Sequence, residues 1–525
     1  MRGCLLLVLH AHLPYVRHPE YERFLEEDWL FEALTESYLP LLEVLERLAS
    51  ENVPARLAFS LSPTLVSMLE DPLLQERYVR HLERLGRLAG REAYRTRHEP
   101  RFKPLALFYR RLFAARRRQF EERYRRRLLP AFRALQEAGV IELLCGTATH
   151  AYLPLLRLEP AAVRAQVKTG AAYCAARFGR RPRGIWLAEC GYYPGLEEVL
   201  KGAGLEFFFL ETHGVELARP TPAFAPYEPV RCPGGPVAFG RDREACRLVW
   251  SAAEGYPGDP DYREFHRDIG FDLPLDYLGE ALPGGCRTFT GLKYWRVTGA
   301  TNDKEPYSPE RAARKARRHA ADFVFRLREQ VRYLGEKTGR PPLVVAPYDA
   351  ELFGHWWFEG PQFLEALVRE LAAQEEVEMV TPSGYLASYP NLHVAQPAAS
   401  SWGARGYHEV WLSEGNDWIW PQLHRAAEAM RELVMSRDGH PSALERRALN
   451  QALRSLMLAQ ASDWPFLIRA GTAADYARQR LQGHLGSFFY LEQAIRTGRL
   501  EPAKLAAIEE LEGALAGEVD YQSFR

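Results

Sequence analysis

The chain has 525 residues, of which 47% are hydrophobic and 26% charged, and 68 basic residues balance 68 acidic ones. This length favours two or three domains, and a net charge of zero excludes a general electrostatic attraction to nucleic acid or to anionic membranes. Seven scattered cysteines without a CxxC pair exclude a disulfide framework and a thiolate zinc site, so a reducing cytoplasm is the expected location. Aromatic residues make up 12% of the chain, which fits a protein that stacks ring faces on sugars.

The N-terminal residues 4–9 form a continuous apolar run, which predicts a strand that is buried on both faces. The run is too short to span a membrane, and no small-residue cleavage site of a signal peptide follows it. Because alternate residues of a strand point to the same side, His10 and His12 at its end are expected to lie together. A helix over 31–49 and a second strand over 55–59 are expected next.

Residues 64–135 predict a helical and strongly basic insertion. Its arginine runs at 116–118 and 125–127 raise the question of nucleic-acid binding. Around these runs, however, aromatic residues share one helical face, acidic residues are interleaved, and no nucleic-acid-binding motif is present. A solvated helix face is therefore the better interpretation, and no nucleic-acid partner is expected.

Strands and helices then alternate along the chain, which predicts parallel βαβ units. Strands are expected at 140–144, 184–189, 205–210, 237–239, 246–250, 343–349 and 377–381, and helices at 159–178, 308–337 and 361–374. The Pro-rich stretch 216–236 predicts a loop. The stretch 251–306 has little periodicity, and a long irregular stretch in a compact protein usually has a function.

Prolines and small polar residues at 390–400 indicate a domain boundary. Beyond it the pattern is helical, with candidates at 420–437, 441–461, 472–496 and 502–516. The expected organisation is a catalytic domain over 1–398, with insertions at about 64–135 and 216–306, followed by an α-helical domain over 399–525.

Two carboxylates follow apolar runs of the same design. Glu189 ends the run that begins at 184, and Asp349 ends the run that begins at 343. In an α/β barrel the C-terminal ends of the strands carry the chemistry, so two acids on two strand ends suggest a pair that cleaves glycosides. The alternative is that both acids only cap the helices that follow them.

Five motifs in order carry a resemblance to a known family. They are 10–14 (HAHLP), 146–150 (GTATH), 186–192 (WLAECGY), 346–356 (APYDAELFGHW) and 461–466 (ASDWPF). With these motifs the chain resembles glycoside hydrolase family 57, in particular its 1,4-α-glucan branching enzymes. The resemblance spans nearly the whole chain, and it implies an incomplete (β/α)7 barrel followed by a helical domain that completes the active site.

By this resemblance Glu189 is the nucleophile and Asp349 the general acid/base. The chemistry agrees, because a retaining enzyme needs one ionised carboxylate to attack the anomeric carbon and one carboxylic acid to protonate the leaving oxygen. The resemblance also implies a tyrosine near the tip of a mobile loop over the cleft. The corresponding stretch, 231–243, contains no tyrosine, which leaves the balance between transfer and hydrolysis open.

The histidines raise a question about metal, because two histidines at a strand end can form half of a zinc site. The resemblance implies instead that they bind sugar and that the enzyme needs no metal or other cofactor. Hydrogen bonds from His10, His12 and His150 to glucose hydroxyls are therefore expected. Further substrate-binding residues implied by the resemblance are Trp402 and Trp411 in the acceptor groove, Asp463, Trp464 and, with weaker support, Arg263.

The expected protein is thus a cytoplasmic and monomeric retaining branching enzyme that acts on an α-1,4-glucan. An α-1,4-glucan hydrolase and a 4-α-glucanotransferase share its first half-reaction and remain alternatives. A more distant alternative is a metal-dependent deacetylase or mannosidase that uses the histidines as ligands. A non-catalytic glycan-binding protein is the remaining alternative, and the paired acids argue against it.

Overall fold

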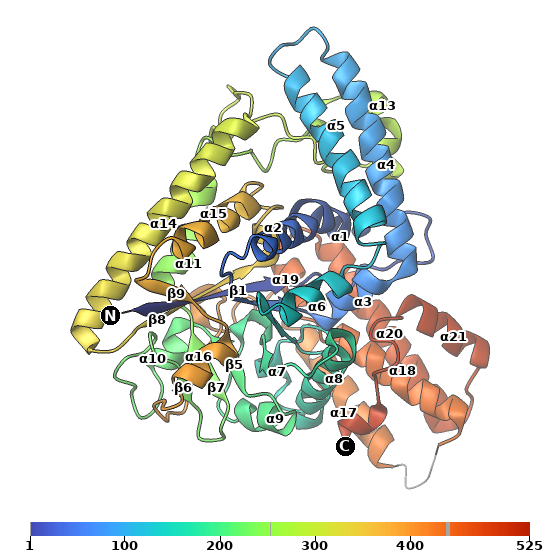
Figure 1. The fold of residues 1–525 in the computed structure, drawn as a ribbon. Helices are drawn as coiled ribbons and strands as arrows, with labels where there is room; N and C mark the ends of the chain where they lie inside the picture. The colour runs from blue at the N-terminus through green and yellow to red at the C-terminus, as the bar shows by residue number, and fades with distance from the viewer. Residues whose placement is uncertain (1, 252–253, 437–440) are drawn as a thin grey trace.

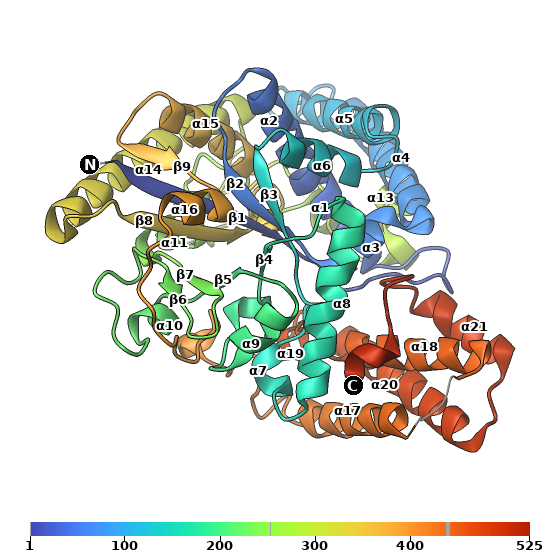
Figure 2. The same cartoon turned by 60° about the horizontal axis from the view of Figure 1, so that its bottom comes forward.

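The structure is a computed structural model that describes residues 2–251, 254–436 and 441–525. Its main sheet is parallel and is built around β1 (Gly3–Ala11). One edge of β1 pairs with β8 (Leu343–Asp349), while the other is shared between β9 (Val377–Met379) and β2 (Leu57–Leu61). β3 (Ile141–Leu144) continues the sheet beyond β2, and Figure 2 shows this order.

A second sheet contains β4 (Gly184–Ile185), β5 (Phe207–Leu210) and β7 (Val237–Gly240), which are parallel. The short β6 (Val230–Arg231) joins the edge of β7 in the antiparallel direction. All of the expected barrel strands except that at 246–250 are therefore present, with ends displaced by a few residues.

The two sheets are joined into a ring at two narrow seams. A parallel bridge between Cys145 and Ile185 links β3 to β4. On the other side, the Asp242 N–H just beyond β7 donates to the Val345 oxygen of β8 at 2.8 Å. Within the described residues the ring is β1-β2-β3-β4-β5-β7-β8, so the predicted incomplete (β/α)7 barrel is confirmed.

The alternation of side chains along the strands decides what faces the barrel interior. All nine residues of β1 are buried, as the continuous apolar run predicts. Leu6 and Val8 pack inside the barrel with residues of the other strands, while Leu5, Leu7 and Leu9 pack outward against the helices. The even-numbered residues that follow, His10 and His12, are therefore directed toward the C-terminal mouth of the barrel.

Helices cover the barrel on its outer side. The segment expected as one helix over 31–49 is α1 (Glu27–Ala33), a π-turn over Leu34–Tyr38 and α2 (Leu39–Ser50) in succession. The other barrel helices are α8 (Pro160–Phe178), α14 (Pro309–Thr338), α15 (Gly360–Ala372) and the shorter α7 (Leu153–Leu156), α9 (Leu196–Gly202), α10 (Thr212–Glu216) and α16 (Pro382–Ser388). The long α14 runs along one side of the molecule in Figure 1.

The basic insertion consists of α3 (Pro63–Glu70), α4 (Pro72–Arg95), α5 (Lys103–Arg118) and α6 (Leu129–Glu137). Its α4–α5 hairpin projects from the barrel (Figure 1). Arg116 and Arg126 form ion pairs with Glu43 and Glu76 at 2.9 and 2.8 Å. These pairs support the interpretation of a solvated face whose arginines serve neighbouring helices.

The second insertion corrects one expectation. The segment expected as a strand at 246–250 is a helix, α11 (Arg243–Trp250), and Asp242 caps it by accepting a hydrogen bond from the Ala245 N–H at 2.6 Å. The buried residues Ala245, Cys246, Leu248 and Val249 follow helical spacing, which a stretch of five residues does not reveal. After α11, the described part of the insertion is mostly irregular, with the short α12 (Ile269–Asp272), α13 (Leu275–Leu278) and single turns.

The C-terminal tail is helical as expected, with α17 (Ile419–Met435), α18 (Ala443–Ala459), α19 (Asp463–Ala470), α20 (Ala474–Thr497) and α21 (Pro502–Leu511). The short α19 was not among the expected helices. The tail lies beside α8 on one side of the barrel (Figures 1 and 2). Of the helices that the structure describes, none is long and apolar enough to cross a membrane.

Candidate active site

A cavity of about 510 Å³ lies at the C-terminal mouth of the barrel. Segments at or just beyond the ends of β1, β4 and β8 supply His10, His12, Glu189 and Asp349, and Trp402 together with Asp463 and Phe466 of the tail closes one wall. The lining residues are His10, His12, His150, Glu189, Arg241, Trp250, Asp349, Glu351, Trp402, Asp463 and Phe466. The structure thus brings seven of the ten predicted site residues to one cavity.

Glu189 is held in a turn beyond the end of its strand. β4 ends at Ile185, and Glu189 lies in a 3-10 turn with φ of 62°, a left-handed conformation that is uncommon for a residue with a side chain. The Trp402 indole N–H donates to Oε2 at 2.7 Å, and the Ser462 hydroxyl donates to Oε1 at 3.0 Å. Burial raises the pKa of Glu189, while these two donors favour its ionised form. The unfavourable backbone conformation thus directs the carboxylate of Glu189 into the cavity.

A directed chain of hydrogen bonds ends on Glu189. Because Ser462 Oγ donates to Glu189, it accepts from Nδ1 of His150, which lies 2.9 Å away. Nε2 of His150 is then an acceptor for Nε2 of His10 at 3.0 Å, and Nδ1 of His10 accepts from the Ser60 hydroxyl at 3.1 Å. Burial lowers the pKa of both histidines well below the usual range, so this chain is neutral.

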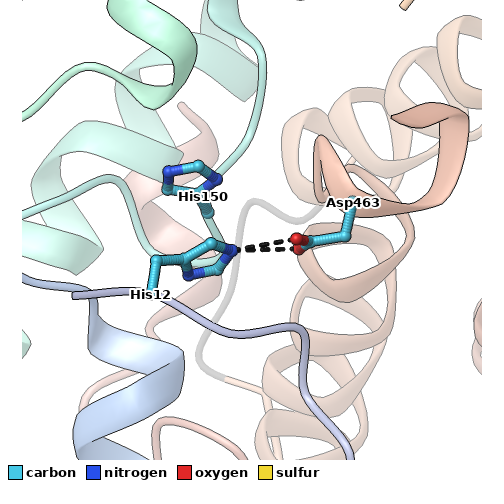
Figure 3. Close-up of side chains that lie close together, drawn as sticks. All are labelled: His12, His150 and Asp463. Carbon is cyan, nitrogen blue, oxygen red and sulfur yellow. Dashed lines mark hydrogen bonds and ion pairs between the residues drawn. The ribbon is translucent and has the colours of Figure 1, made fainter. Parts of the chain in front are cut away.

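His12 forms a separate pair with the tail. Its Nδ1 lies 2.9 Å from the Ser62 Oγ, and its Nε2 lies 3.0 and 3.2 Å from the two Asp463 oxygens (Figure 3). The His12 and His150 rings are stacked, with centroids 3.6 Å apart. All six ring nitrogens of His10, His12 and His150 therefore have protein partners, and the predicted hydrogen bonds to glucose hydroxyls would require one of these to be exchanged.

His12, His150 and Asp463 are close enough together to be considered as a metal site. Zinc lies in the plane of each imidazole that binds it, about 2.0–2.1 Å from the nitrogen. The planes of His12 and His150 are within 17° of parallel and stacked face to face, so the lone pairs of the two rings do not converge on one point. This geometry favours the metal-free prediction.

We therefore expect the catalytic activity to survive exhaustive dialysis against a chelator. Activity on amylose before and after dialysis, with the metal content measured by elemental analysis, checks this prediction. Loss of activity that zinc restores would instead indicate the deacetylase-like alternative.

Asp349 has an environment opposite to that of Glu189. No donor among the described residues stabilises its carboxylate, and burial followed by the charges of Glu351 and Glu189 raises its pKa well above the usual range. Arg241, which lines the same cavity and is paired with Glu211 at 3.0 Å, opposes this shift only in part. A protonated Asp349 beside an ionised Glu189 is the arrangement that acid-assisted glycosyl transfer requires.

Glu351 is a third carboxyl group in the cavity, and the sequence did not single it out for a role. Its Oε1 accepts from the His12 N–H at 3.1 Å and from the Tyr38 hydroxyl, while Oε2 has no hydrogen-bond partner among the described residues. Burial raises its pKa to about 7. Glu351 therefore gains its charge close to neutral pH, two residues away from Asp349.

Glu351→Gln is expected to move the alkaline limb of the pH profile of kcat/KM on amylose to lower pH, by about one unit. The negative charge of Glu351 raises the pKa of Asp349, so Asp349 loses its proton at lower pH once that charge is removed. Profiles of both proteins, measured between pH 5 and 10, check the sign. A uniform loss of activity without any displacement of the limb would indicate a purely structural role for Glu351.

The three remaining predicted residues do not line the cavity. Trp411 is 1% exposed and is stacked on Tyr152 at 4.3 Å. Trp464 is fully buried, and its indole donates to the Leu458 oxygen at 2.7 Å. Arg263 is buried in an ion pair with Glu36 at 2.7 Å. Direct contact of these three residues with a substrate stays a prediction.

Other cavity residues escaped the sequence analysis. Arg241 precedes α11 and Trp250 ends it, so the helix brings both side chains to the mouth of the barrel, and the strand expected at 246–250 did not predict this. Phe466 lies within the ASDWPF motif, which already contains Asp463, and so does Ser462, which donates to Glu189 without lining the cavity itself. The position of Glu351 in the APYDAELFGHW motif, two residues after Asp349, was the available signal for its role.

The stretch 231–243 does not take the place of a lid. Its turn at 232–236 precedes β7, and the Val237 N–H donates to the oxygen of Glu206, which precedes β5. The turn therefore lies at the N-terminal ends of the strands, on the opposite side of the barrel from the cavity. Of this stretch only Arg241 lines the cavity, and the tail with its linker supplies the cover through Trp402, Asp463 and Phe466.

Such a barrel, with two carboxyl groups of contrasting environment in one cavity, is characteristic of glycoside-cleaving enzymes. The chain belongs to glycosyl hydrolase family 57, whose model matches residues 6–396. Residues 422–524 match a second model, described as the C-terminal region of 1,4-alpha-glucan branching enzyme.

Known relatives cover nearly the whole chain. A 1,4-alpha-glucan branching enzyme of Thermococcus kodakarensis is 33% identical over 98% of this chain and 77% of its own. The crystal structure of the alpha-amylase AmyC of Thermotoga maritima superimposes with a TM-score of 0.93 and 41% identity over 100% of this chain and 99% of that one. The crystal structure of a family 57 branching enzyme of Pyrococcus horikoshii superimposes with a TM-score of 0.89. It is 33% identical and covers 100% of this chain and 97% of its own.

Proposed function

We propose that the protein is a retaining 1,4-α-glucan branching enzyme. The observation that carries the proposal is the contrast between Glu189, which accepts two hydrogen bonds, and Asp349, which accepts none from the described residues, in one cavity. Such a contrast supports Glu189 as the ionised nucleophile and Asp349 as the protonated acid. The similarity of residues 422–524 to branching-enzyme C-terminal regions supports the choice of reaction.

In the first half-reaction, Glu189 attacks C1 of an α-1,4-linked glucose while Asp349 gives its proton to the departing O4. The donor chain then remains on Glu189 as a glycosyl ester, and the rest of the glucan leaves with a new 4-hydroxyl. In the second half-reaction, ionised Asp349 takes the proton of an acceptor 6-hydroxyl, whose oxygen displaces Glu189 from C1. The product is an α-1,6 branch, and both carboxyl groups return to their initial states.

The protein residues support these steps through orientation. Trp402 and Ser462 fix the two oxygens of Glu189, and the neutral chain through His150 and His10 holds the Ser462 hydroxyl in its donating direction. We propose that the three histidines form the wall against which the cleaved glucose lies. Asp463, paired with His12, completes this wall from the tail.

A hydrolase is the second candidate. The 41% identical structure is titled an alpha-amylase, and in this chain the stretch 231–243 does not cover the cavity. If water reaches the glycosyl ester as readily as a 6-hydroxyl does, the same carboxyl groups hydrolyse the glucan.

Incubation with amylose separates the two candidates. Branching forms α-1,6 linkages, counted after debranching, without a matching rise in reducing ends, whereas hydrolysis raises reducing ends and forms no branches. We expect branches to exceed new reducing ends. The opposite ratio would assign the protein to the hydrolases, and new α-1,4 chains without branches would assign it to the 4-α-glucanotransferases.

We also propose a cellular compartment and an oligomeric state for the enzyme. Six of the seven cysteines are buried and all seven are free, which fits a reducing cytoplasm. A monomer is the proposed state, and light scattering on the purified protein tests it.

A further inference from the structure

An aromatic ridge runs along the surface of the second insertion beyond the catalytic end of β8. It consists of Trp356, Phe265, Phe289 and Phe271. Trp356 is stacked on Phe265, with centroids 4.5 Å apart and planes at 27°. Phe289 lies 5.3 Å from Phe265 and 5.2 Å from Phe271, so the four rings form a continuous row.

The two ends of the ridge are open to solvent. Trp356 is 55% exposed and Phe271 is 45% exposed, whereas the adjacent Trp357 is 2% exposed. The Trp356 indole N–H has no hydrogen-bond partner among the described residues, and this leaves a donor beside an open ring face. Trp356 thus offers the apolar face and polar edge that a sugar ring requires.

The ridge is held rigidly from beneath. Lys293 is 1% exposed, and its ammonium lies 4.0 Å from the Phe265 ring centroid and 4.2 Å from that of Phe289. The same ammonium donates to the Phe265 oxygen at 2.6 Å. Because Phe265 and Phe289 are held by these contacts, the rings on which Trp356 and Phe271 pack are fixed before any ligand arrives, which limits the side-chain entropy lost on binding.

The ridge is also connected to the wall of the cavity. The backbone N–H of Trp356 donates to the backbone oxygen of Glu351 at 3.2 Å, and the side chain of Glu351 lines the cavity. The turn of Ala350–Leu352 begins directly after Asp349 at the end of β8. One backbone hydrogen bond therefore links Trp356 to a residue whose side chain lines the cavity.

We propose that the ridge from Trp356 to Phe271 is a remote binding subsite for the α-1,4-glucan chain, with Trp356 as its stacking platform. This inference rests on the proposed glucan substrate. The subsite would retain long chains near the cavity and would not contact short ones, so its effect should depend on the length of the substrate.

The test uses Trp356→Ala and Phe271→Ala, with Phe325→Ala and Tyr333→Ala as matched controls. Phe325 and Tyr333 are both 60% exposed and lie on α14, outside the ridge. Retardation of each variant in native gels that contain amylose gives the affinity, in a Glu189→Gln background that cannot consume the polymer. Trp356→Ala is expected to weaken amylose binding by about tenfold, Phe271→Ala by less, and the controls not at all.

Kinetics with the active enzyme add a second measurement. Trp356→Ala is expected to raise KM for long amylose and to leave kcat/KM for a short activated maltooligosaccharide unchanged. Unchanged amylose affinity, or an equal loss on short and long substrates, would overturn the proposal. So would a dimer of the natural protein that Trp356→Ala converts into a monomer, because the ridge would then be an interface between two copies.

These outcomes are separable from the failure of the proposed function. If the natural protein only hydrolyses amylose but Trp356→Ala still weakens its binding, then branching is refuted and the subsite stands. If Trp356→Ala does not fold, Trp356→Phe keeps a ring on Phe265 with a smaller face, and it should show an intermediate affinity.

Discussion

Glu189→Gln is expected to abolish both transfer and hydrolysis, with a fall in kcat of about 10⁴-fold or more. The amide keeps the shape of the side chain but cannot form the glycosyl ester. Its carbonyl oxygen can still accept one of the hydrogen bonds from Trp402 and Ser462, so the fold of the site should persist. Activity on amylose, together with the thermal unfolding midpoint, separates loss of chemistry from loss of structure.

A suitable control for this change is Glu206→Gln. Glu206 lies before β5 at the opposite end of the barrel, where it pairs with Arg183, and its loss should leave kcat unchanged. Turnover of Glu189→Gln close to that of the natural protein would show that another group attacks the anomeric carbon. In that case Asp463 or Glu351, the other carboxyl groups of the cavity, would have to be examined.

The barrel was predictable because its strands are buried on both faces. The apolar runs 4–9 and 343–348 are strands, and their pairing places His10 and Asp349 side by side at one mouth. The strand predicted at 246–250 was wrong because five residues cannot distinguish a strand from one face of a short helix. The Asp242 cap, which decides the matter, lies just before that run.

The details of the site were less accessible to sequence reasoning. Glu189 was expected at a strand end, but its orientation depends on a left-handed turn stabilised by Trp402 and Ser462, which are more than two hundred residues away in the sequence. No local pattern records such a contact. The same reason explains Trp411 and Trp464, since an aromatic residue in a matching motif can serve the packing of the site as well as its surface.

Asp349→Asn is expected to lower activity on amylose by about 10²–10⁴-fold, because the 4-oxygen of a glucose is a poor leaving group without a proton. Burial and the charges of Glu351 and Glu189 raise the pKa of Asp349, which favours its protonated form, and asparagine cannot supply that proton. The first step should nevertheless survive with a donor that carries an activated leaving group, since such a group departs as an anion.

The second step distinguishes this account from a structural role for Asp349. Asparagine cannot take the proton of the acceptor hydroxyl, so the glycosyl ester on Glu189 should accumulate in Asp349→Asn. An initial burst of the activated leaving group, followed by a slow phase, would report the accumulation. Mass spectrometry of the protein would then find the added sugar on the peptide that contains Glu189. If activity on amylose is lost but neither a burst nor a modified peptide forms, Asp349 does not act in the ester chemistry. The role of acid/base would then have to move to Glu351, whose carboxyl group lines the same cavity and whose pKa is raised to about 7.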